Sequence, residues 1–113
     1  IAVPCDPTGW ACLQVIDLKR GGPNSLKNLV VGALPWRGAE PPTAVTVIGL
    51  AAVEQGLTGT ELFTEGGLQV TGNASVVDVG LSSNFRDFGV GTVTHAWGWR
   101  TAVQKAQAAA AES

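Results

Sequence analysis

Short apolar runs, each ended by glycine, proline or charged residues, divide this chain into segments of strand length. Residues 10–18 alternate between two faces that are both largely apolar, which predicts a strand covered on both sides or lying in an interface. Residues 29–34 predict a second strand, and the proline-rich residues 35–42 predict a loop. None of the apolar runs approaches the roughly 20 residues that a membrane-spanning helix needs. We therefore expect no membrane span.

The longest patterned stretch, residues 43–81, predicts a β-meander. Its residues 45–48 are β-branched and consecutive, which favours a pleated strand over a helix. Residues 68–71 and 77–81 alternate between apolar and other side chains, and glycine-containing turns separate them. Residues 51–55 fit either a strand leading into a loop or one helical turn, and we favour the strand. Residues 82–91 predict a loop, and residues 93–99 a last strand.

The two ends of the chain have a different character. Residues 1–9 contain two prolines and no periodicity, which predicts an extended arm or loop that becomes ordered on another subunit. Residues 101–113 are rich in alanine and predict a short helix or a tail. Together the patterns predict one domain over residues 1–113: mainly β, a small barrel or sandwich with a β-meander core, an extended N-terminal arm and a short C-terminal helix.

Composition adds an expectation of assembly. Charged residues make up 14% of the 113 residues, against roughly 25% in ordinary soluble domains, and the mean hydropathy is +0.22. Such a surface is expected to be partly buried against other chains, as in a homo-oligomer. The net charge of −2 argues against a nucleic-acid partner, because phosphate binding needs a clustered positive face. The first residue, Ile1, is expected to follow processing, a cleaved secretory signal or a truncation.

The two cysteines, Cys5 and Cys12, leave two interpretations open. In an exported protein they could close a small disulfide loop. Alternatively, both are reduced thiols at the edge of a strand. Their spacing alone does not indicate a metal site, and no motif predicts a metal or a cofactor.

Aromatic residues supply the best candidates for an interaction surface. His95, Trp97 and Trp99 are expected on one face of the last strand, as an apolar platform or as core. His95 is the only histidine, and no spacing pairs it with an acid or a nucleophile, so we expect no enzymatic activity. The candidate interaction residues are Ile1, Val3, Trp36, Arg37, His95, Trp97 and Trp99.

Residues 47–72, VIGLAAVEQGLTGTELFTEGGLQVTG, resemble the corresponding stretch of small capsid decoration proteins of tailed phages. The short loop that begins at Trp36-Arg37-Gly38 also fits that family. The resemblance implies a non-enzymatic structural protein on the virion surface, whose oligomers, often trimers, stabilise a capsid lattice. The alternative is a secreted small β-domain, either a binding module or a toxin-like protein, that uses its aromatic face.

Overall fold

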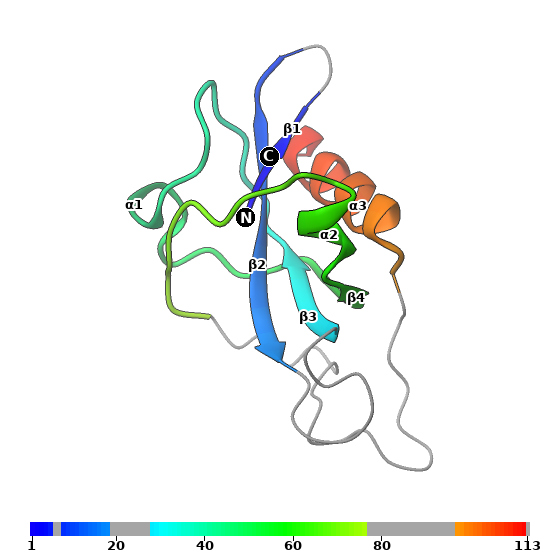
Figure 1. Ribbon diagram of the computed structural model, residues 1–113. Helices are drawn as coiled ribbons and strands as arrows, with labels where there is room; N and C mark the ends of the chain where they lie inside the picture. Colours follow the sequence, from blue (N-terminus) through cyan, green and yellow to red (C-terminus); the bar gives the residue numbers. More distant parts are fainter. Residues whose placement is uncertain (6–7, 19–27, 77–96, 113) are drawn as a thin grey trace.

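The computed structural model describes residues 1–5, 8–18, 28–76 and 97–112. A four-stranded antiparallel sheet in the order β1-β2-β3-β4 organises the fold (Figure 1). The elements are β1 (Ala2–Pro4), β2 (Trp10–Leu18), β3 (Asn28–Ala33), α1 (Ala44–Val47), β4 (Glu54–Gly59), α2 (Glu61–Thr64) and α3 (Trp99–Ala111).

Strand β2 is the centre of the sheet, as its two apolar faces predict. Its first residues pair with β1, with Cys12 opposite Ala2. Its later residues pair with β3, with Val15 opposite Val31 and a bulge between Val15 and Asp17. The strand predicted over residues 10–18 is confirmed. Within the described residues β4 does not pair with β1, so this sheet is open and a closed barrel is not formed.

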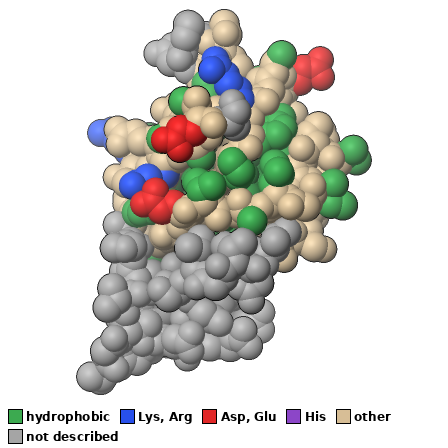
Figure 2. Space-filling model, turned by 180° about the vertical axis from the view of Figure 1, so that it is seen from behind, with side chains coloured by type: hydrophobic (Ala, Val, Ile, Leu, Met, Phe, Trp, Pro, Cys, Tyr) green, Lys and Arg blue, Asp and Glu red, His purple; other side chains and the backbone are tan. Residues whose placement is uncertain are grey.

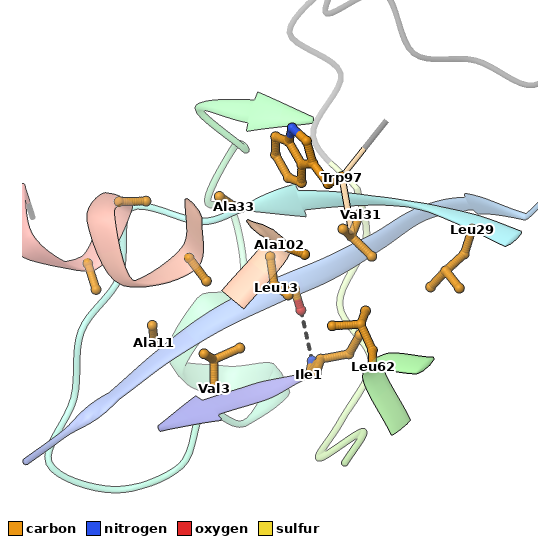
Figure 3. Close-up of a cluster of buried hydrophobic side chains, with 13 residues drawn as sticks. Ile1, Val3, Ala11, Leu13, Leu29, Val31, Ala33, Leu62, Trp97 and Ala102 are labelled. Carbon is orange, nitrogen blue, oxygen red and sulfur yellow. Dashed lines mark hydrogen bonds between the residues drawn. The ribbon is translucent and has the colours of Figure 1, made fainter. Parts of the chain in front are cut away.

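The first face of the sheet carries the larger core, and α3 covers it. The buried residues of α3 are all alanines, and such small side chains let a helix lie close to a sheet. Alanine also has the highest helix propensity, so local preference and packing agree here. The predicted helix is confirmed, with its start at Trp99. The buried residues of this core are Ile1, Val3, Ala11, Leu13, Leu29, Val31, Ala33, Leu62, Trp97, Ala102, Ala106, Ala109 and Ala110 (Figure 3).

A second, smaller cluster lies on the opposite face, and the chain between α1 and β4 crosses β2 in the view of Figure 1. It consists of Cys12, Leu34, Val47 and Ala52. Because Cys12 belongs to this cluster while Ala11 and Leu13 belong to the larger core, β2 is buried on both faces over residues 11–13. The described helices include none that is long and apolar enough to span a membrane.

The N-terminal residues form a strand of this sheet, which corrects the prediction of an arm. Ile1 donates from its amino group to the Leu13 carbonyl at 2.8 Å and accepts from the Leu13 N–H at 3.1 Å. The Ala2 N–H donates to the Gln69 carbonyl at 3.0 Å. Ile1, Ala2 and Val3 are all buried. Proline excludes a helix here but permits a strand at the sheet edge, and the apolar side chains find their partners within the same chain.

The strand expected over residues 45–48 is wrong, because this segment is the helix α1. Thr43 and Thr46 form a reciprocal capping box that satisfies both backbone N–H groups at the helix start. In so short a helix these local hydrogen bonds outweigh the β preference of the branched side chains. The expected strand over residues 68–71 is reduced to one bridge, between Gln69 and Ala2. The segments predicted over residues 77–81, 82–91 and 93–96 lie outside the described residues.

Candidate interaction surface

Large aliphatic side chains are exposed along the segment that contains α1 and along the chain that returns past it. The most exposed are Val45 at 83% and Ile48 at 69% of their full accessible surface. All five large exposed apolar residues of the described chain fall between positions 45 and 76: Val45, Ile48, Val53, Val70 and Val76. In Figure 2, which views the molecule from the side opposite to that in Figure 1, several hydrophobic side chains lie together on the surface. Single exposed valines are ordinary, whereas several on neighbouring segments indicate an interaction site.

Helix α1 and its C-cap residue, Ile48, hold two exposed aliphatic side chains in a fixed position. Thr46 Oγ1 accepts from the Thr43 N–H at 2.8 Å, and Thr43 Oγ1 accepts from the Thr46 N–H at 3.4 Å. Val47, on the inner side, is buried in the second cluster. Gly49 then turns the chain with φ +82, a conformation that glycine adopts without strain. As a result, Val45 and Ile48 project to solvent from a backbone that is capped at one end and anchored by its own core.

Residues 70–74 lie beside α1 and are fixed there by hydrogen bonds. Thr71 Oγ1 donates to the Pro42 carbonyl at 2.6 Å. Gln14 Nε2 donates to the Ala74 carbonyl at 2.9 Å. A Cβ at Gly72 would lie 3.0 Å from the Ala44 nitrogen, so the two backbones approach closely where glycine permits it. Residues 70–74 and the start of α1 are therefore neighbouring parts of the structure.

A cavity of about 80 Å³ opens between these two segments and the sheet. Its apolar walls include Leu34, Ala44, Val47 and Val70, and none of the described residues that line it is Asp, Glu, Lys or Arg. Gln14 also lines it, and the Oε1 atom of Gln14 is buried without a hydrogen-bond partner in the part of the chain that the structure describes. A single water molecule needs only about 10–15 Å³ of such a cavity. The cavity is therefore large enough for a small branched side chain. We refer to it below as the α1 cavity.

The structure separates the candidate residues that the sequence had grouped. Ile1, Val3 and Trp97 are buried in the larger core. Of these three, Ile1 also lines the α1 cavity. Trp99 is half-buried at the start of α3, and its Nε1 donates to Glu65 Oε2 at 3.0 Å. His95 lies outside the described residues. The expected strand face is therefore not formed by Trp97 and Trp99, which belong to a loop and a helix.

Trp36 and Arg37 do lie at the surface and do not line the α1 cavity, although Trp36 packs against the second cluster. Arg37 is exposed, and its Nη2 donates to the Thr8 carbonyl at 3.4 Å. Trp36 is half-buried, with its ring against Gly38. Arg37 also borders a second cavity, of about 140 Å³, together with Cys5 and Gln107. The contacts of these two side chains hold a loop against the start of β2.

Cys5 and Cys12 are free thiols in this structure, which is the second of the two interpretations that the sequence left open. Cys5 packs against the larger core on one face of the sheet, whereas Cys12 belongs to the cluster on the other. The Cys5 N–H donates to the Gly9 carbonyl, which sets Cys5 opposite Gly9 in the hairpin. Gly9 and Cys12 are then about 10 Å apart at ~3.4 Å per strand residue, beyond the roughly 7 Å limit for a bridged pair.

We expect the two thiols to differ in reactivity. Burial raises the pKa of the Cys12 thiol, and the nearby α-amino group of Ile1 offsets part of that rise. Cys5 is only half-buried and borders a cavity. In the native protein one thiol should react quickly with Ellman's reagent, and the second should react only on unfolding. Cys5→Ser should remove the fast phase, and two fast phases would contradict this assignment.

The described residues supply few groups for catalysis or metal binding. Among them, no three His, Cys, Asp or Glu side chains lie close enough together to hold a metal ion. The side chains that line the α1 cavity include amides, hydroxyls and the Cys12 thiol, and Ile1, which carries the α-amino group, lines it as well. Comparison of the chain with known protein families, with curated proteins and with solved structures gave no match.

Proposed function

We propose that this protein is a non-enzymatic structural protein that binds other protein subunits through the surface formed by α1 and residues 70–76. The observation that carries the proposal is the exposure of Val45 and Ile48 on a capped helix whose inner side is anchored in the core. Rigid apolar side chains bind at low entropic cost, because little freedom is lost on docking. The low charge of the whole chain supports the same conclusion.

The setting that we propose for this assembly is the outer surface of a tailed-phage capsid. Support comes from the resemblance of residues 47–72 to capsid decoration proteins, and Ile48, Val53 and Val70 of the exposed set fall inside that stretch. A decoration protein repeats many weak contacts over a lattice, so each contact surface can be small. An antibody against this chain should label intact virions from the same source, and labelling of the soluble fraction alone would contradict this setting.

The assembly itself can be tested with the purified chain. Sedimentation velocity at high micromolar concentration should show species larger than the monomer. The double variant Val45→Ser, Ile48→Ser should weaken this association at least tenfold, because it removes apolar area that is exposed in the monomer. Its melting temperature should stay within a few degrees of wild type, since surface substitutions usually cost less than about 0.5 kcal/mol.

A matched control changes two exposed positions of α3, on the opposite side of the sheet. Gln104→Ser with Ala108→Ser has the same number of substitutions and the same net charge. It should leave association unchanged. Equal weakening by both double variants would mean that α1 has no special part in assembly.

A further inference from the structure

Residues 70–76, which we call the strap, lie across one side of the α1 cavity. Residues 70–74 of the strap line the cavity, together with residues of α1 and of strand β2. Ala74 also packs against the second cluster, which contains Cys12. Cys12 lines the cavity as well and is only 3% exposed. The strap is therefore part of the cover over the cavity and over this thiol.

Among the described residues, hydrogen bonds rather than apolar burial hold the strap in place. Thr71 Oγ1 donates to the Pro42 carbonyl at 2.6 Å, and Gln14 Nε2 donates to the Ala74 carbonyl at 2.9 Å. Every residue of the strap except Ala74 is exposed, its two valines included. A segment with few buried apolar contacts opens locally at a much lower free-energy cost than the whole domain.

The Gln14 side chain favours closure of the strap less than a fully paired amide would. With the strap closed, Gln14 Oε1 is buried and has no hydrogen-bond partner in the part of the chain that the structure describes. A buried polar atom without a partner costs free energy, and that cost is relieved when water reaches the atom. Opening of the strap breaks the bond from Gln14 Nε2 to Ala74 but lets water reach the side-chain amide. The two effects oppose each other, so the closed state is only weakly preferred at this position.

The chain that leads into the strap is fixed by contacts of its own. The Ala2 N–H donates to the Gln69 carbonyl at 3.0 Å, and the Leu68 N–H donates to the Leu62 carbonyl at 3.1 Å. Leu68 also packs against the larger core. None of these contacts involves a residue of the strap, so they can persist while the strap moves.

We infer that the strap is a gate of the α1 cavity: residues 70–76 lift away from Pro42 and Gln14, with Gln69 as the pivot, while the rest of the domain stays folded. Opening gives molecules in solution access to the cavity and to Cys12. The unfolding that lets Cys12 react is then local unfolding of the strap. This inference concerns a single chain and goes beyond the proposed assembly, so it stands or falls independently of that assembly.

The rate at which Cys12 reacts with Ellman's reagent measures the opening of the gate. In a Cys5→Ser background Cys12 is the only cysteine, and the measurement is made at low micromolar protein concentration. Below the urea unfolding transition, reaction through a local opening should depend little on urea, because opening exposes little surface. A rate that rises steeply with urea from the lowest concentrations would mean that the whole domain must unfold, and would overturn the inference without any variant of the strap.

Thr71→Val removes one hydrogen bond of the strap with almost no change in side-chain size. It should speed the reaction of Cys12 about fivefold, since one neutral hydrogen bond shifts an equilibrium by roughly that factor, and should leave the urea midpoint close to that of the Cys5→Ser parent. Thr64→Val is the matched control, because Thr64 is exposed at the end of α2 and does not line the cavity. It should react at the rate of the parent. Equal acceleration by both variants, or none by Thr71→Val, would overturn the inference.

Discussion

Replacing Trp97 with alanine is expected to lower the free energy of unfolding by about 3–5 kcal/mol, the usual cost of truncating a buried tryptophan. Trp97 is only 5% exposed and belongs to the larger core (Figure 3). Its ring lies directly against Gly56 of β4, where a Cβ would overlap it. Its backbone N–H donates to the Leu57 carbonyl at 2.6 Å. The truncation would leave a hollow above β4 that the rigid sheet cannot close.

Trp99→Ala is the matched control for this prediction. Trp99 is half-buried, and its indole N–H donates to an exposed carboxylate of Glu65. We expect Trp99→Ala to lower the free energy of unfolding by less than half as much as Trp97→Ala does. Water can replace both the contacts of the Trp99 ring and its hydrogen bond. Urea denaturation followed by far-ultraviolet circular dichroism gives both values. Equal losses would mean that Trp97 is not the deeper of the two side chains.

A severe effect is expected because the domain has little stability to spare. Small domains are stable by about 5–15 kcal/mol in total. Trp97→Ala would therefore remove a large part of the free energy of unfolding and should impair every property that depends on folding. The Val45 substitutions act at an exposed position and should change association alone. This contrast distinguishes residues that hold the fold from residues that serve the proposed assembly.

The parts of the fold that the sequence predicted correctly are those whose signal is local. The alternation in residues 10–18 and the alanine content after residue 100 predict β2 and α3, because each pattern lies within its own segment. The helix α1 shows the limit of that approach. Four consecutive β-branched residues favour a strand, yet the hydroxyls of Thr43 and Thr46 cap a helix. Since the outcome depends on two hydrogen bonds, propensity alone could not decide it.

Long-range contacts explain the remaining misses. Gly56 interrupts an apolar pattern for no local reason, and its role is visible only once Trp97 is placed over it. Trp97 and Trp99 have the spacing of one strand face, but the chain enters α3 between them. The candidate surface was overlooked because Val45 and Ile48 were assigned to a buried strand. One available signal was the spacing of Thr43 and Thr46, which is that of a capping box.

Strand β1 provides the sharpest test of the corrected fold, and Val3→Asp is expected to unfold the domain or to cost more than about 4 kcal/mol. The Val3 side chain is fully buried in the larger core, whose buried members are all hydrophobic residues. A buried charge without a partner is among the most costly changes a core can receive. A free arm would accept the same substitution with little effect on melting temperature.

Val45→Asp is the control for this prediction, because it makes the same chemical change at a site that is 83% exposed. It should leave the urea midpoint within about 0.5 kcal/mol of wild type. If Val3→Asp yields no folded protein, Val3→Ala provides a milder measurement, with an expected loss of about 1.5–3 kcal/mol from two methyl groups and the cavity they leave. A Val3→Ala variant as stable as wild type would mean that residues 1–4 are an arm that does not stabilise the fold. The expected loss of stability would mean that β1 is an integral strand of the sheet.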